Sequence, residues 1–110
     1  MQRKPLPNCH GGKGTVDWTE VLNEADLPGR TLKFIHDDIL PPGASVGAHH
    51  HDDEEYYYIL SGEGEMALNG QTHKVTAGDI TAVFPGGSHA LINTGASDLR
   101  FIVICTHPPK

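Results

Sequence analysis

The stretch that decides the fold is Gly43–Gly62, GASVGAHHHDDEEYYYILSG, in which two short segments flank a dense run of ionisable residues. The segment after the run is aromatic and β-branched, as strands favour, and Asp52-Asp53 is typical of a turn. We therefore expect strands at roughly 44–50 and 54–60, joined by a short charged loop. The same run also holds three imidazoles and four carboxylates, which makes it a candidate binding site for a cation.

Short segments separated by turn residues continue along the rest of the chain. Asn69-Gly70 predicts a two-residue hairpin, because its turn requires a positive φ at both positions. About eight short strands at such spacing predict an all-β sandwich or barrel in one domain. Apart from the two strands above, they are expected at roughly 30–40, 65–68, 71–75, 80–84, 89–93 and 99–105.

The first 29 residues follow a different pattern. The first thirteen are polar and rich in Pro and Gly, and indicate an arm. Trp18, Val21, Leu22 and Ala25 are spaced i, i+3, i+4 and i+7, which predicts a short amphipathic helix ending before Leu27. We expect residues 1–29 to pack as an arm and short helix on a barrel formed by residues 30–110.

Composition limits the partners of this chain. Its 110 residues suit one hydrophobic core, and its formal charge of −6 argues against nucleic acid or an anionic membrane as a partner. There is no apolar run of membrane-spanning length and no secretion signal at the N-terminus. Two cysteines do not make a disulfide framework, so a cytoplasmic location is expected.

Alternation along strands selects residues within the charged run. Side chains two apart share a face, so His49 and His51 point the same way and His50 points the other way. Glu55 opens the next strand and can turn back toward the two imidazoles. A fourth ligand is expected from a distant strand, and His89 is the best candidate. The competing interpretations are a solvated charged loop and a buried, hydrogen-bonded histidine. The same count assigns to the rim His50, Asp52, Asp53 and Glu54.

These residues resemble the cupin family. The first cupin motif, G-x5-H-x-H-x3-E-x6-G, is matched by Gly43, His49, His51, Glu55 and Gly62. The second, G-x5-P-x-G-x2-H-x3-N, is matched by Gly78, Gly86, His89 and Asn93. Phe84 occupies the motif's proline position, with the proline one residue later, but the distance from Gly78 to His89 is preserved.

The resemblance implies a single-domain jelly-roll barrel with one metal ion bound by His49, His51, Glu55 and His89. Three imidazoles and one carboxylate suit Mn, Fe, Co, Ni, Cu or Zn, and the net charge of +1 favours a small anionic oxygen ligand. The expected partner is therefore a small molecule, and the resemblance also implies a homodimer.

The resemblance leaves the activity open. One hypothesis is a metal-dependent enzyme acting on a small carbonyl or carboxylate compound, of the dioxygenase, decarboxylase, isomerase or lyase type. The alternative is a non-catalytic module that binds or senses a small anion, and a third is a metal-free barrel. Tyr57 shares the face of Glu55 and is a catalytic candidate, or it fills the barrel. His36 is a second candidate, with a surface position as its alternative. Its strand also carries Asp37 and Asp38, one of which must face the interior.

Overall fold

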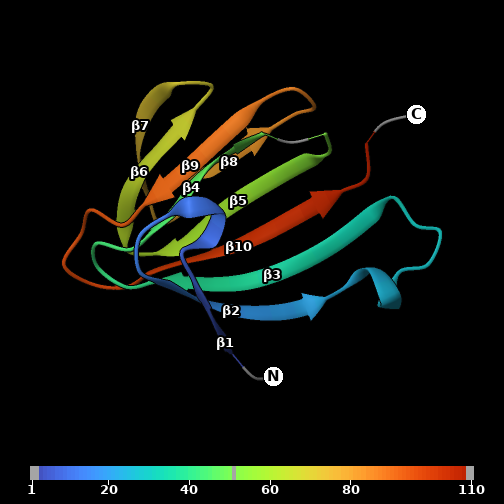
Figure 1. Cartoon of the computed structure of the whole chain (residues 1–110), viewed down its shortest axis with the longest axis horizontal. Helices are drawn as coiled ribbons and strands as arrows, with labels where there is room; N and C mark the ends of the chain where they lie inside the picture. Colours follow the sequence, from blue (N-terminus) through green and yellow to red (C-terminus); the bar gives the residue numbers. More distant parts are fainter. Residues whose placement is uncertain (1–2, 51, 109–110) are drawn as a thin grey trace.

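Two antiparallel sheets face each other as a jelly roll in the computed structural model, which describes residues 3–50 and 52–108 (Figure 1). One sheet has the order β1-β2-β3-β10-β5-β8, and the other has the order β4-β9-β6-β7. The strands are β1 (Lys4–Pro7), β2 (Thr15–Leu22), β3 (Leu32–Leu40), β4 (Ser45–His50), β5 (Glu54–Ser61), β6 (Glu63–Leu68), β7 (Gln71–Thr76), β8 (Ile80–Val83), β9 (Ser88–Ile92) and β10 (Leu99–Thr106).

The eight strands expected from residue 30 onward are all present, with ends that differ by no more than two residues. The hairpin at Asn69-Gly70 is confirmed: φ is 50° at Asn69 and 83° at Gly70, and Leu68 pairs with Gln71 across the turn. The predicted all-β jelly-roll fold is therefore confirmed.

The predicted helix over Trp18–Ala25 is wrong, because Thr15–Leu22 is strand β2. β2 pairs with β3, with Trp18 opposite Asp38, and so supplies hydrogen-bond partners that the edge of β3 would otherwise lack. Its residues, TVDWTEVL, include several that favour strands, and the helical spacing of three of them with Ala25 carried no weight against sheet pairing. In the described part of the chain, helical turns are limited to η1 (Cys9–Gly11) and η2 (Glu24–Asp26).

The core lies between the two sheets and is filled from both. The six-stranded sheet contributes Leu40, Ile59 and Phe101, and the four-stranded sheet contributes Val46, Met66 and Leu91, all at most 4% exposed. Further along the same strands, inward-facing positions are taken by polar side chains instead of apolar ones. These positions are His36, Asp38, His49, Glu55 and His89.

A bulge in β4 brings His49 to the inside. Val46 pairs with Leu91 and His49 pairs with His89, so three steps along β4 correspond to two steps along β9. The extra residue reverses the alternation, and consequently Val46 and His49 both face the interior although they are three residues apart.

No described helix is long and apolar enough to cross a lipid bilayer.

Candidate metal centre

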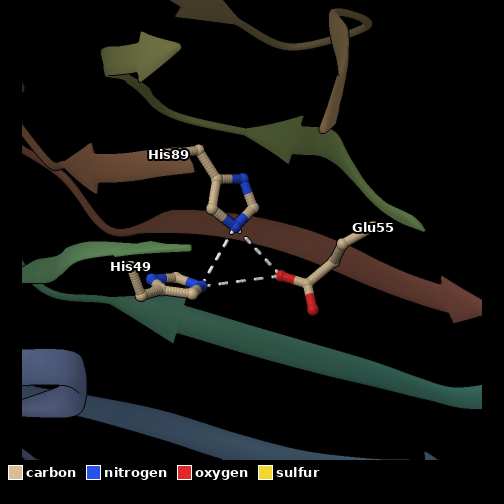
Figure 2. Close-up of side chains that lie close together, drawn as sticks. All are labelled: His49, Glu55 and His89. Atoms are coloured by element: carbon tan, nitrogen blue, oxygen red, sulfur yellow. Dashed lines mark hydrogen bonds and ion pairs between the residues drawn. The ribbon is translucent and has the colours of Figure 1, made fainter. Parts of the chain in front are cut away.

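Three side chains from three strands converge at one point between the sheets (Figure 2). His89 Nε2 lies 3.1 Å from His49 Nε2 and 3.1 Å from Glu55 Oε1, while His49 Nε2 and Glu55 Oε1 are 4.0 Å apart. His49 and His89 are a cross-strand pair in the four-stranded sheet, whereas Glu55 belongs to the six-stranded sheet. The cluster therefore bridges the two sheets.

The orientation of His49 is set by the backbone. Its Nδ1 lies 2.8 Å from the carbonyl oxygen of Gly47. A carbonyl oxygen only accepts, so Nδ1 carries the proton and donates, and in the neutral ring the Nε2 lone pair faces the cluster. Histidines that bind metals in proteins are usually held in this way by a hydrogen bond at the second nitrogen.

The donor set fits a divalent transition metal. The cluster offers two imidazole nitrogens and one carboxylate oxygen, all within 4.8 Å of one another. Mixed nitrogen and oxygen sets of this kind suit Mn, Fe, Co, Ni, Cu and Zn. The side chains are well shielded, at 11% exposure for His49, 7% for Glu55 and 2% for His89. A cation between them would be shielded from bulk water.

Three of the four residues predicted as ligands are thus brought together. The prediction for His51 falls on a residue that lies outside the described part of the chain. His50 is exposed, as strand alternation predicted. Phe84, at the motif's proline position, is 54% exposed and begins a turn in which the Gly87 N–H donates to its carbonyl oxygen, so His89 keeps its place on β9.

A cavity of about 110 Å³ reaches the cluster at Glu55. It lies between the strands of the large sheet, β4 and the N-terminal segment. Its lining includes aromatic, imidazole, thiol and carboxyl groups. Of the predicted catalytic candidates, both Tyr57 and His36 line this cavity.

The position of Tyr57 fits barrel filling, one of the two roles left open by the sequence, and its catalytic role stays a prediction. Tyr57 is 5% exposed and its ring stacks on Phe101 at a centroid distance of 5.0 Å, so it fills the core. The same ring lies 4.7 Å from the ring of His89. Burial, followed by the negative charges of Glu55 and Asp38, raises the pKa of Tyr57 well above its usual value. Its hydroxyl therefore stays protonated.

His36 lies in the cavity lining instead of on the outer surface. Its Nδ1 accepts a hydrogen bond of 2.8 Å from Trp18 Nε1, and its ring stacks on Phe34 at 4.2 Å. Burial lowers the pKa of His36 to about 4, so the ring is neutral near pH 7. With Nδ1 accepting, the remaining proton is on Nε2.

The strand β3 also settles which neighbouring aspartate faces inward. Asp38 lines the cavity, whereas Asp37 is held by Arg3 and Arg100 at distances of 2.6–3.0 Å. Alternation had required one of the two to face the interior, and the register of β3 decides that it is Asp38.

Two residues of the N-terminal segment lie at the site, although no pattern in the sequence predicts their position. The ring of His10 stacks on His49 with centroids 3.7 Å apart and planes 15° apart, and Cys9 lines the cavity. Both belong to η1, a short turn that packs on β4. No periodicity in residues 1–13 indicates this contact.

The rim is less acidic than its composition implies. Asp53, one of the residues assigned to the rim, forms an ion pair of 3.1 Å with Lys33. Glu54 is half-buried, and its Oε1 accepts a hydrogen bond of 3.5 Å from the Tyr56 hydroxyl. An approaching anion therefore meets less negative charge than three free carboxylates would present.

Both the sequence and the fold of this chain match those of known proteins. The family model for the cupin domain matches residues 37–105. A curated relative, the oxalate-binding protein of Thermotoga maritima, is 40% identical over 100 residues, which cover 90% of this chain and 82% of the relative.

Solved structures extend the likeness to the fold. A crystal structure of a predicted oxalate decarboxylase from Thermotoga maritima matches with a TM-score of 0.92 and 35% identity, covering 97% of this chain and 93% of that one. A polyketide cyclase from Streptomyces resistomycificus matches with a TM-score of 0.76 and 22% identity, covering 97% and 77% of the two chains. The second likeness concerns the fold alone.

Proposed function

The chain belongs to the cupin family, and from this we propose that it binds a small carboxylate of the oxalate class at a divalent transition metal ion. His49, Glu55 and His89 would hold the ion, with His51 as a fourth ligand. The observation that carries the proposal is the convergence of three ligand atoms at the edge of a cavity of about 110 Å³. The oxalate-binding relative, at 40% identity, supports this class of ligand.

The chemistry of the cluster suits an anionic oxygen ligand. One carboxylate on a divalent ion leaves a net charge of +1, and such an ion supplies Lewis acidity that binds and polarises a carboxylate oxygen. The chain's own residues orient and shield the ligand. Gly47 holds the ring of His49, and the aromatic lining from Trp18, Phe34 and Tyr57 limits the water around the bound molecule.

Metal analysis combined with oxalate binding tests this proposal. Purified protein should contain close to one divalent transition metal ion per chain by mass spectrometry. Calorimetry should show oxalate binding to the loaded protein and none after the ion is removed with a chelator. His49→Ala and His89→Ala should lose both the ion and oxalate binding.

The neighbouring histidine provides the matched control. His50 is exposed, so His50→Ala should keep both properties. Equal oxalate binding by the loaded and the chelator-treated protein would contradict the proposal. An equal loss of metal in His50→Ala and His49→Ala would also contradict it.

A second candidate function is turnover of the bound acid by a metal-dependent oxidoreductase, lyase or isomerase. The observation that favours it is the presence of Tyr57 and His36 in the same cavity as Glu55, since these groups can donate or accept protons there. Release of formate or carbon dioxide from oxalate would reveal it. Tyr57→Phe removes only a hydroxyl and should then slow turnover while leaving metal content unchanged. No product from oxalate, glyoxylate or related hydroxy acids would leave binding as the function.

A further inference from the structure

The wall of the cavity contributed by β3 carries a buried carboxyl group that the fold satisfies only in part. Asp38 is 6% exposed, and its Oδ1 is buried and has no hydrogen-bond partner among the residues that the structure describes. The carboxyl group also receives a hydrogen bond from the backbone N–H of Thr19. A buried polar atom without a partner costs free energy. Because this atom lies beside a cavity, we expect a ligand in the cavity to supply the missing hydrogen bond.

Asp38 is placed away from the metal cluster along the strands. Strand β10 lies between β3 and β5, and Val103 pairs with His36 on one side and with Tyr57 on the other. Asp38 is two residues beyond His36, on the side away from the level of Glu55. The cavity therefore has the cluster at one end, His36 and Tyr57 along its length, and Asp38 beyond them.

Both β3 groups are hydrogen-bond donors near neutral pH. Burial raises the pKa of Asp38 to about 7, so an appreciable share of the carboxyl groups carries a proton there. His36 accepts from Trp18 at Nδ1, which leaves the Nε2–H as its donor. Two donors at this position suit an oxygen atom that can only accept, such as that of a carboxylate or carbonyl group.

The volume of the cavity limits the ligand. Pockets for drug-sized ligands measure about 300–1,000 Å³, so a cavity of about 110 Å³ suits a much smaller molecule. Two- and three-carbon acids have this size.

We propose that Asp38 and His36 are the specificity-determining residues of this cavity and bind the end of a two- or three-carbon acid that is remote from the metal cluster. The ligand is then held at two points: one carboxylate at the cluster and one accepting oxygen at Asp38 and His36. The inference rests on the proposed function for the first of these points. It adds that a remote oxygen is required and that the chain length is restricted.

The single tryptophan of the chain provides the readout. Trp18 lines the cavity and donates its indole N–H to His36, so its fluorescence should respond when a ligand engages His36. Zn²⁺-loaded protein is titrated with oxalate, with acetate, which lacks the remote oxygen, and with succinate, which is longer. Oxalate should bind at least tenfold more tightly than acetate or succinate.

Two variants remove the donors. Asp38→Ala and His36→Phe should each weaken oxalate binding by about ten- to hundredfold, as expected for losing a hydrogen bond to a charged group, and should leave acetate binding unchanged. Because His36→Phe alters the surroundings of Trp18, its affinity is measured by calorimetry. Glu20→Gln is the matched control, since Glu20 is exposed and pairs with His36 across β2 and β3.

The outcomes separate this inference from the proposed function. Oxalate binding of equal strength in wild type, Asp38→Ala and His36→Phe overturns the inference and leaves the metal-dependent function standing. Absence of oxalate binding by loaded wild type overturns both. If a variant does not fold, the comparison of oxalate, acetate and succinate on wild type decides: equal affinities for the three acids overturn the inference.

Discussion

Asp38 carries a carboxyl group whose burial affects the stability of the fold. Its pKa is about 7 in the folded chain, against about 3.9 for an aspartate in an unfolded chain. A raised pKa means that the unfolded chain releases this proton first. The contribution of Asp38 to the free energy of unfolding is therefore fully present below about pH 4 and is lost as the pH rises to about 7.

Asp38→Asn removes this dependence, because an amide does not ionise. The variant should gain stability relative to wild type as the pH rises from 4 to 7, by a total on the order of 3 to 4 kcal/mol. Urea denaturation at several pH values measures the difference. Asp98→Asn changes an exposed carboxyl group and controls for the loss of charge. A difference between Asp38→Asn and wild type that stays constant from pH 4 to pH 8 would refute the prediction.

Glu55 and His89 should respond differently to substitution. Glu55→Gln keeps the shape of the side chain but removes the negative ligand, raising the charge of a metal centre from +1 to +2. His89→Ala deletes a side chain of the cluster that is only 2% exposed and leaves a space. If the chain is an enzyme, Glu55→Gln should lower turnover more than metal content, whereas His89→Ala should lower metal content itself. Metal analysis beside an activity assay measures both. Parallel losses in the two variants would count against separate roles.

At the scale of elements, the N-terminal segment is attached to β4 by close backbone contacts. The Ser45 N–H donates to the Lys13 carbonyl oxygen at 2.8 Å, and the Lys13 N–H donates to Ser45 Oγ at 2.8 Å. Gly47 on β4 leaves room for the segment, since a Cβ there would overlap the carbonyl oxygen of His10. This contact sets the ring of His10 against that of His49.

Gly47→Ala should therefore displace the η1 segment from β4. Backbone shifts forced by one added methyl group in a packed region cost about 1 to 3 kcal/mol, so the free energy of unfolding should fall by that amount. Metal affinity should also fall, because the Gly47 carbonyl oxygen orients His49. Ala48→Ser, at the exposed neighbouring position, is the control for urea denaturation and metal titration. Stability and affinity equal to those of wild type would show that the segment does not hold the site.

At the scale of the whole molecule, the six-stranded sheet ends in β8, an edge strand with exposed apolar side chains. Ile80 is 60% exposed and Phe84, just after the strand, is 54% exposed. Edge strands invite pairing, and exposed large apolar groups favour association. The expected homodimer stays a prediction, and β8 is the part of the surface that we expect it to use.

Light scattering at micromolar concentration should give about twice the monomer mass of 11.9 kDa. Ile80→Lys should shift the protein toward the monomer, because a charge at this edge opposes pairing of two copies. Glu63→Lys, at an exposed position on β6 in the other sheet, controls for the added positive charge. A wild-type mass of 11.9 kDa would contradict the prediction.

Much of the fold could be predicted from the sequence because its signals are local. Turn residues such as Asn69-Gly70 punctuate the chain, and each strand after residue 30 lies between two such signals. The predicted cluster of His49, Glu55 and His89 followed from alternation and motif spacing. Phe84 in place of the motif proline did not disturb it, because the number of residues between Gly78 and His89 is unchanged.

Tertiary structure decided what depends on pairing between distant segments. Residues 15–22 form a strand because the edge of β3 needs a partner, although the spacing of apolar residues over 18–25 matches a helix. The bulge in β4 exists only against β9, and it is what lets Val46 and His49 face inward together. The register of β3 selects Asp38 over Asp37, and the packing of η1 on β4 brings His10 to His49. Side-chain alternation depends on one strand alone and can be read from its sequence. Register, bulges and packed turns depend on two segments, so the sequence of one segment does not determine them.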